Sequence, residues 1–175
     1  MSDGGFLPLR IGVLTVSDTR SEATDTSGGL IVQTLTQAGH EVAARKIVPD
    51  DIPTIRDTFR SWQLELELNV VVTTGGTGIT VRDVTEEALS PFISKSIPGF
   101  GELFRWLSFE EIGAATIQSR AFAGLCDSTL LFALPGSTGA VRLALNRIIV
   151  PQLDARTKPC NFAMLMPKLR GQSHS

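Results

Sequence analysis

The chain has 175 residues, of which 42% are hydrophobic, and its formal net charge is −2. A chain of this length can bury the core of one globular domain, and its balanced charge gives no electrostatic basis for binding nucleic acid or an anionic membrane. No apolar run is long enough to span a bilayer, and residues 1–5 lack the basic and apolar regions of a signal peptide, so we expect a cytoplasmic protein.

The few cysteines and histidines disfavour several classes of site. Cys126 and Cys160 are far apart in the sequence, which argues against a disulfide or a zinc site, and we expect both to be small buried residues. His40 follows a turn glycine and His174 lies in the tail, so we expect both to be solvated. The same shortage of histidine disfavours a Ser-His-Asp hydrolase.

The chain begins with a loose arm, residues 1–9, before the first strand. Positions 10–16 are nearly all apolar, which is typical of a strand buried on both faces. Asp25 and Ser27 then offer N-caps for a helix that runs to about Ala38. Both side chains could contact a ligand, although capping is sufficient to explain them.

One acidic residue after the second strand has no structural role in the sequence pattern. Alternation over 41–48 indicates this strand, and a helix over about 52–66 follows it. Asp51 is the natural N-cap of that helix, with Pro53 in its first turn. Asp50 is therefore left over at the carboxyl end of a strand.

A glycine-rich loop follows the third predicted strand, which covers 70–73. Its glycines lack a Cβ atom and allow a ligand to approach the backbone closely, and successive N–H groups in such a loop can cradle phosphate oxygens. The loop lacks the Gly-Lys-Ser/Thr ending of a Walker A loop. The residues of the loop are Thr74, Gly75, Gly76, Thr77 and Gly78.

Asp83 places a carboxylate beside this loop, and two roles are open to it. It would repel a bound phosphate unless a cation lay between them, and Mg²⁺ is the natural choice because it is commonly shared by carboxylates and phosphates. Asp83 and Glu86 also have the spacing of a capping box for a helix from about Val84 to Phe92. The two roles are compatible.

Large apolar side chains are concentrated between positions 98 and 109. Core packing is the default interpretation, and a subunit interface is the alternative, because an apolar patch of this size is rarely left in water. A capping pattern predicts a second helix from Ser108 to about Gly124. The apolar residues are Phe100, Leu103, Phe104, Trp106, Leu107 and Phe109.

The last predicted strand, 129–134, ends at a second glycine turn that contains Gly136. Ser137 is a good N-cap for a helix to about Ile149, and the same turn is a second candidate ligand site. From Pro151 onward we expect a tail that lies on the surface or reaches a neighbouring subunit.

The alternation of strands and helices predicts an α/β fold, a three-layer α/β/α sandwich with a mostly parallel sheet. Ligands of such folds bind beyond the carboxyl ends of the strands. We therefore expect the glycine, hydroxyl and carboxylate groups that follow predicted strands to gather along one edge. These groups belong to Asp18, Asp50, residues 75–83, Gly136 and Ser137.

Four stretches are specific enough to suggest a family. They are TTGGTG at 73–78, RDVTEEA at 82–88, PGFGE at 98–102 and LPGS at 134–137. They resemble the MoaB/Mog family of molybdenum cofactor biosynthesis proteins, which includes the G domain of gephyrin. The stretches LSFEEIG, QSR, PQLDART and PCNF are most similar to the MoaB branch. The resemblance implies one molybdopterin-binding domain over 10–162, preceded by the arm 1–9 and followed by a tail, 163–175.

The resemblance also implies an activity. In the Mog branch this is an adenylyltransferase that moves AMP from Mg-ATP to the terminal phosphate of molybdopterin and releases pyrophosphate. By matching position, Asp50 and Asp83 would bind Mg²⁺ and serve catalysis. The nucleotide phosphates would be held by Thr74, Gly75, Gly76, Thr77 and Gly78. The implied molybdopterin pocket contains Ser17, Asp18, Ser27, Glu102, Gly136 and Ser137.

Two functions stay open at this point. The chain has the acidic pattern of the Mog branch at Asp50 and Asp83, which favours the enzyme, while its body resembles the MoaB branch, in which a non-catalytic molybdopterin-binding or carrier protein is the alternative. Residues 137–139 depart from the family, because relatives often carry Asn or Gln before a proline there. The family forms trimers, and hexamers in the MoaB branch, so self-association is expected.

Overall fold

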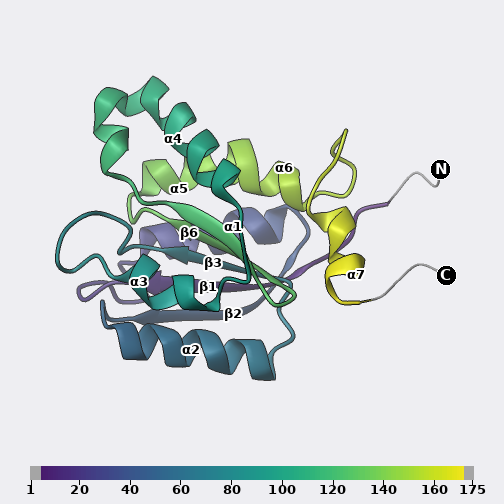
Figure 1. Cartoon of the computed structure of the whole chain (residues 1–175), viewed down its shortest axis with the longest axis horizontal. Helices are drawn as coiled ribbons and strands as arrows, with labels where there is room; N and C mark the ends of the chain where they lie inside the picture. The colour runs from purple at the N-terminus through teal and green to yellow at the C-terminus, as the bar shows by residue number, and fades with distance from the viewer. Residues whose placement is uncertain (1–4, 172–175) are drawn as a thin grey trace.

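The computed structural model describes residues 5–171, which form a six-stranded sheet between two layers of helices (Figure 1). The strand order is β2-β1-β3-β6-β5-β4. The first four of these strands are parallel, whereas β5 runs antiparallel to β6 and β4 antiparallel to β5. The strands are β1 (Arg10–Val16), β2 (Glu41–Val48), β3 (Val70–Thr74), β4 (Lys95–Ser96), β5 (Phe122–Cys126) and β6 (Thr129–Leu134).

Helices cover both faces of the sheet, as the alternating sequence pattern predicts. One face is covered by α2 (Ile52–Glu65), α3 (Thr85–Leu89) and the short 3₁₀ helix η1 (Ser90–Phe92). The other is covered by α1 (Thr26–Gln37), α4 (Pro98–Ile112), α5 (Thr138–Ala144), the π-helical turn η3 (Leu145–Ile149) and α6 (Val150–Leu153). The expected three-layer α/β/α architecture is therefore confirmed.

The central strands are mostly apolar because both of their faces are buried. Val72 of β3 lies between Val13 of β1 and Phe132 of β6, and all three side chains are fully buried. This register brings the ends of β1, β3 and β6 to the same edge of the sheet. The long loop between β3 and α3 protrudes at that end of the molecule, opposite α7 (Figure 1).

The edge of the sheet beyond β6 differs from the sequence prediction. The prediction of a separate helix from Ser108 to Gly124 is wrong, because Ser108 is a buried residue inside α4. Helix α4 ends only at Gly113, which adopts a φ of 59°. A 3₁₀ helix, η2 (Gly113–Gln118), follows, and then β5 forms a hairpin with β6 through a turn at Asp127.

The C-terminal segment packs on the core and is not simply an exposed tail. After α6 the chain forms η4 (Ala163–Leu165) and α7 (Met166–Leu169), which bury Ala163 and Met166 in the larger apolar cluster. The buried Asn161 side chain ties this segment together by donating to the carbonyls of Ala155 and Thr157.

Two sequence expectations about single residues are also wrong. His40 is buried, because the ring of Phe6 packs against its ring, tilted by 39° at a centroid distance of 5.1 Å, and the N–H of Leu9 donates to its Nδ1. Cys160 is exposed, whereas Cys126 is buried as expected. His174 lies outside the described residues. Within residues 5–171, no helix is both long enough and apolar enough to cross a membrane.

Candidate functional site

The carboxyl ends of the parallel strands converge on one edge of the sheet, where two cavities lie side by side. The larger, of about 420 Å³, is lined by the glycine-rich loop, by Asp83 and by apolar residues of α4. The smaller, of about 250 Å³, is lined by residues that follow β1, including Ser17 and Ser27. Gly75 and Gly136 line both cavities and therefore lie between them.

The glycines of the loop are required by close packing. Gly75 has a φ of 98°, and a Cβ atom on it would lie 2.1 Å from the carbonyl oxygen of Val16. Gly76 has a φ of 65°, and its Cβ would lie 2.4 Å from Oγ1 of Thr85. Thr85 in turn donates its hydroxyl to the Gly75 carbonyl at 2.8 Å. The loop is thus pressed between the end of β1 and the start of α3, with no room for side chains.

The two threonines of the loop are inward-facing. Thr74 is buried and donates its hydroxyl to the Pro135 carbonyl at 2.8 Å, which ties the end of β3 to the end of β6. Thr77 is also buried, and its carbonyl accepts the N–H of Arg120. The side chain of Thr74 is therefore already engaged in holding the two turns together.

Asp18 and Asp50 hold each other in place across the ends of β1 and β2. The N–H of Asp18 donates to Oδ2 of Asp50, and the N–H of Asp50 donates to Oδ1 of Asp18, both at 3.1 Å. The guanidinium of Arg82, from the loop before α3, forms an ion pair with Asp18. Asp18 is therefore charge-compensated, whereas Asp50 has no basic partner among the ion pairs of the described residues.

Asp83 does not cap the helix that follows it, so the capping-box expectation is wrong. Helix α3 begins at Thr85, and its N-cap residue, Val84, provides no side-chain hydrogen bond. The carboxylate of Asp83 instead turns back and accepts from the N–H and the hydroxyl of Thr80 at 2.8 and 2.6 Å. This turn aims Oδ2 at Gly78, on which a Cβ atom would lie only 2.7 Å away. Glu86, the other half of the expected box, pairs with Arg120.

The carboxylates of Asp50 and Asp83 influence each other electrostatically. Burial and the negative charge of Asp83 together raise the pKa of Asp50. Burial also opposes ionisation of Asp83, but hydrogen bonds from Thr80 and Gly78 and the charge of Arg120 outweigh it, so the pKa of Asp83 is lowered. Asp83 is thus stabilised as an anion, and its negative charge disfavours the ionisation of Asp50.

The carboxylates of Asp50 and Asp83 could bind Mg²⁺ only if substrate phosphates and water supplied its other ligands. Over the part of the chain that the structure describes, no three His, Cys, Asp or Glu side chains are grouped so that they could hold a metal ion. Mg²⁺, however, commonly takes one or two carboxylates and completes its shell with substrate phosphates and water. Asp50 and Asp83 both lie against the glycine-rich loop, near Gly76 and Gly78, so such a pair of carboxylates is present there.

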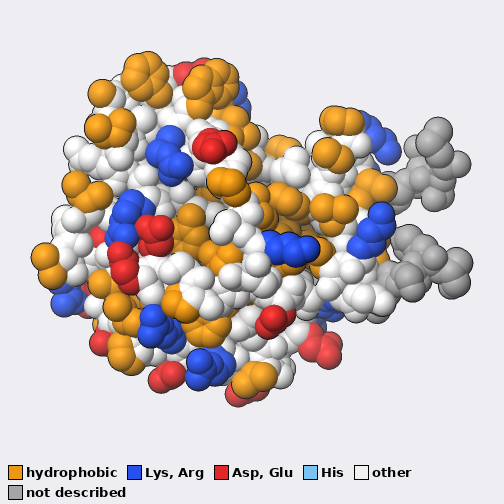
Figure 2. Space-filling model, in the orientation of Figure 1, with side chains coloured by type: hydrophobic (Ala, Val, Ile, Leu, Met, Phe, Trp, Pro, Cys, Tyr) orange, Lys and Arg blue, Asp and Glu red, His pale blue; other side chains and the backbone are white. Residues whose placement is uncertain are grey.

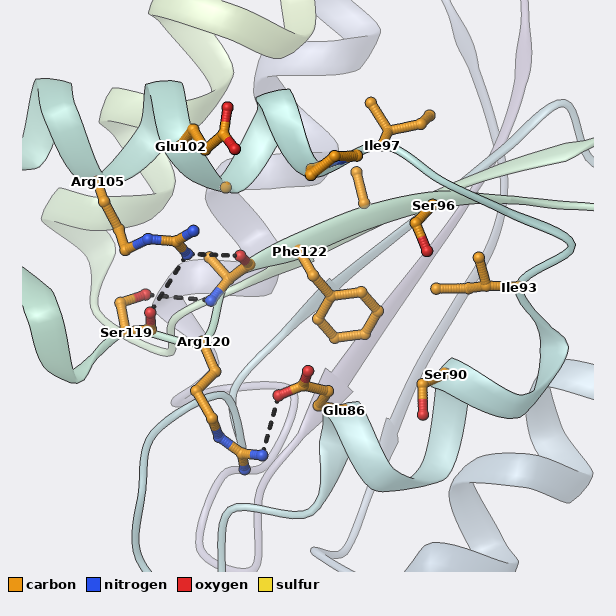
Figure 3. A pocket seen from close by; sticks show the side chains of 14 residues that line it. Glu86, Ser90, Ile93, Ser96, Ile97, Glu102, Arg105, Ser119, Arg120 and Phe122 are labelled. Atoms are coloured by element: carbon orange, nitrogen blue, oxygen red, sulfur yellow. Dashed lines mark hydrogen bonds and ion pairs between the residues drawn. The ribbon is translucent and has the colours of Figure 1, made fainter.

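The remaining expected pocket residues divide between the cavities. Ser17 and Ser27 line the smaller one, where Ser27 donates to the Gly136 carbonyl at 2.8 Å. Ser137 lines the larger one and caps α5 through the N–H of Ala140. Glu102 does not join them, because it faces a third cavity, of about 470 Å³, between α3 and α4 (Figure 3).

Asp25 is the N-cap of α1, as predicted, and it also anchors the smaller cavity. Its carboxylate accepts from the Gly28 N–H, the Thr15 hydroxyl and the Arg45 guanidinium at 2.8 to 3.0 Å. Burial opposes its ionisation, but these hydrogen bonds and the charge of Arg45 dominate and lower its pKa. The cluster joins β1, β2 and α1 at one wall of the site.

Arg120 is the residue of this region to which the sequence pattern assigned no role. It follows η2, far along the chain from the glycine-rich loop, yet it donates hydrogen bonds to the carbonyls of Gly78 and Asp83. Only its presence in the stretch QSR drew attention to it. Its contacts arise from the antiparallel edge of the sheet, which the sequence did not predict.

Comparisons with known proteins agree with this architecture. A family model described as a probable molybdopterin binding domain matches residues 12–155. Molybdenum cofactor biosynthesis protein B of Escherichia coli strain K12 is 51% identical over 157 residues, which cover 90% of this chain and 92% of that protein. A crystal structure of molybdenum cofactor biosynthesis protein B has a TM-score of 0.85 and 42% identity, over 95% of this chain and 98% of that one. A tungsten cofactor synthesizing protein, MoaB from Pyrococcus furiosus, has a TM-score of 0.74 and 41% identity, over 81% and 91% of the two chains. The chain therefore belongs to the MoaB/Mog family.

Proposed function

We propose that this protein acts in molybdenum cofactor biosynthesis and transfers AMP from Mg-ATP to the terminal phosphate of molybdopterin. Membership of the MoaB/Mog family and the names of the relatives support the pathway. The observation that carries the enzymatic proposal is the meeting of Asp50 and Asp83 at the glycine-rich loop. A protein that only carried a pterin would have no need of two neighbouring acids at this loop.

The reaction requires little covalent chemistry from the protein. An oxygen of the molybdopterin phosphate attacks the α-phosphorus of ATP, the bond to the bridging oxygen breaks, and pyrophosphate leaves with the electron pair of that bond. Because the attacking oxygen is already anionic, no histidine base is needed. Positioning and charge stabilisation can supply most of the rate, as in other phosphoryl transfers.

Each part of the site has a role in this proposal. The N–H groups of Gly76 and Thr77 would hold the nucleotide phosphates, because the N–H of Gly75 donates to the Leu134 carbonyl and that of Gly78 to Asp83. Asp50 and Asp83 would hold Mg²⁺, which neutralises charge on those phosphates when bound. Ser17, Asp18 and Ser27, together with Gly136 and Ser137, would form the molybdopterin side. Glu102 is left out of this pocket because it faces the separate cavity between α3 and α4.

Pyrophosphate release from the purified protein with molybdopterin and Mg-ATP tests the proposal. We expect release by the native protein and its loss in Asp50→Asn and Asp83→Asn. The matched control is Asp51→Asn, because Asp51 is the exposed neighbour of Asp50 and its carboxylate caps α2 through Thr54. Asparagine caps nearly as well as aspartate, so the control should keep both fold and activity.

The alternative function is a non-catalytic molybdopterin-binding or carrier protein. The high identity to molybdenum cofactor biosynthesis protein B supports it, because a carrier is the alternative for the branch that this chain resembles. Tight molybdopterin binding by native protein that releases no pyrophosphate would establish the carrier and refute the enzyme.

We also propose that the protein self-associates through the exposed face of α4. Figure 2 shows hydrophobic side chains gathered over this helix. Leu103, Trp106, Phe109 and Ile112 recur every three residues and are 41% to 63% exposed, an arrangement that other subunits of the same chain would cover, as in the trimers and hexamers of the family. Light scattering should find an oligomer that Trp106→Glu dissociates. Leu64→Glu, at an exposed leucine of α2, is the control and should leave the oligomer intact.

A further inference from the structure

Arg120 connects the antiparallel edge of the sheet to the loop that carries Asp83. It precedes β5 and lies on the wall of the cavity between α3 and α4, where its guanidinium points toward α3 (Figure 3). The loop, residues 77–83, runs past the other side of the same guanidinium. Arg120 is thus the one side chain that reaches both ends of this loop among the hydrogen bonds of residues 5–171.

Three hydrogen bonds from Arg120 end on carbonyl oxygens of the loop. Its N–H donates to Thr77 at 2.8 Å, its Nε to Gly78 at 2.6 Å and its Nη2 to Asp83 at 2.8 Å. The first two acceptors precede the exposed tip of the loop and the third follows it. The arginine therefore fixes the two ends of the loop relative to each other.

Acidic side chains of α3 hold the guanidinium in this position. Nη1 pairs with Glu86 at 2.9 Å and with Glu87 at 2.5 Å. Hydrogen bonding by Arg120 lowers the pKa of Glu87, so this partner is ionised at neutral pH. The Arg120 side chain is less than one-third exposed, and each nitrogen atom of its guanidinium has a partner. It is therefore committed to the loop and is not free to act as a ligand for substrate.

Besides Arg120, the ion pair between Arg82 and Asp18 ties the loop to the end of β1, but the Arg82 side chain is 66% exposed, so solvent screens this pair. Ile79 is 68% exposed and Val81 is 95% exposed, so neither packs on the core. The bonds from Thr80 to the Asp83 carboxylate lie within the loop and would move with it as one body. The position of that carboxylate relative to Asp50 thus depends on what ties the loop to the rest of the protein.

We propose that Arg120 is a positioning residue that holds loop 77–83, and with it the carboxylate of Asp83, at the site edge. Lysine cannot replace it, because a single ammonium group cannot donate to Gly78, Asp83 and Glu87 in the fixed fork of a guanidinium. The effect on turnover rests on the proposed function, whereas the effect on the loop does not.

Amide hydrogen exchange of Arg120→Lys tests the proposal directly. We expect exchange of the amides that close the ends of the loop, that of residue 120 to the Thr77 carbonyl and that of Thr85 to the Gly76 carbonyl, to become at least about tenfold faster, because the fork that holds the loop is lost. Arg56→Lys is the matched control, since Arg56 donates to the carbonyls of Glu87 and Ala88 at the end of α3 and does not touch the loop. It should leave exchange of these two amides unchanged.

A second measurement separates positioning from general stability. In Arg120→Lys we expect the Mg²⁺ concentration for half-maximal pyrophosphate release to rise roughly tenfold to a hundredfold, as for displacements approaching 1 Å. The KM for ATP at saturating Mg²⁺ should change far less, and the melting temperature should fall no further than in Arg56→Lys.

The outcomes divide clearly between the two proposals. Unchanged exchange of these two amides in Arg120→Lys would overturn the positioning role, whatever happens to turnover. If the native protein releases no pyrophosphate, the proposed function fails, and the exchange result still decides the role of Arg120. Should Arg120→Lys not fold, Arg120→Gln, which also removes the fork, replaces it in the exchange measurement with the same expected result.

Discussion

Replacing Gly78 by alanine should displace Asp83 without disturbing the fold. The new Cβ atom would lie 2.7 Å from Oδ2 and 3.0 Å from Cγ of Asp83, so the carboxylate must move by about 0.7 Å to reach ordinary contact at 3.4 Å. The hydrogen bonds that hold it, at 2.6 and 2.8 Å from Thr80, would stretch to as much as about 3.3 and 3.5 Å, at which length they are weak. Gly78 has no positive φ, so alanine adds no backbone strain.

The magnitude follows from what these bonds are worth. A hydrogen bond to a charged group contributes roughly 1.5–3 kcal/mol, but water can replace part of it because Asp83 is only half-buried, so we expect the free energy of unfolding to fall by about 1 kcal/mol. A shift of this size in a catalytic carboxylate should lower turnover by about 10- to 100-fold. The loss of activity should therefore exceed what the loss of stability explains.

Urea unfolding and pyrophosphate release, measured side by side, check this expectation. The control is Gly99→Ala, in the first turn of α4, where a Cβ atom would meet nothing within 4 Å. Alanine is the better helix former there, so this variant should be at least as stable as the native protein and fully active. If Gly78→Ala binds Mg²⁺ and turns over like Gly99→Ala, the carboxylate is not held as we describe.

Three further changes test the packing around the site. Asp25→Asn should destabilise the protein at neutral pH. Because the folded-state pKa of Asp25 is lowered from 3.8, the difference in stability between the variant and the native protein should persist above pH 4 and shrink as the pH falls through the folded pKa. Thermal melts at several pH values can follow this difference. Gly75→Ala should cost about 3 kcal/mol in urea unfolding, because it combines a positive φ with a clash against the Val16 carbonyl; a cost as small as that of Gly78→Ala would contradict this. Phe132→Ala should cost roughly 3–5 kcal/mol by the same measurement, since this fully buried ring packs edge-on against Phe100 at 5.2 Å, and a loss below 1 kcal/mol would mean that the core refills the space.

The sequence alone determined the parallel half of the protein and the place of its site. Strands over 10–16 and 129–134, and the caps Asp25, Asp51 and Ser137, are local features that their own residue patterns specify. Because right-handed crossovers bring the carboxyl ends of parallel strands to one edge, the alternation of strands and helices was sufficient to predict that Asp50 and the glycine-rich loop lie at the same edge.

Only the tertiary structure decided how the site is held. Strand β4 has two residues and β5 has five, and their pairing depends on contacts between segments distant in sequence, which local patterns do not encode. That pairing brings Arg120 to the loop. The spacing of Asp83 and Glu86 suits a helix cap, but Glu86 forms an ion pair with Arg120 and the Asp83 carboxylate accepts a hydrogen bond from Thr80. The Asp83 carboxylate is therefore turned by a hydrogen bond three residues away, while a long-range ion pair removes Glu86 from the helix cap.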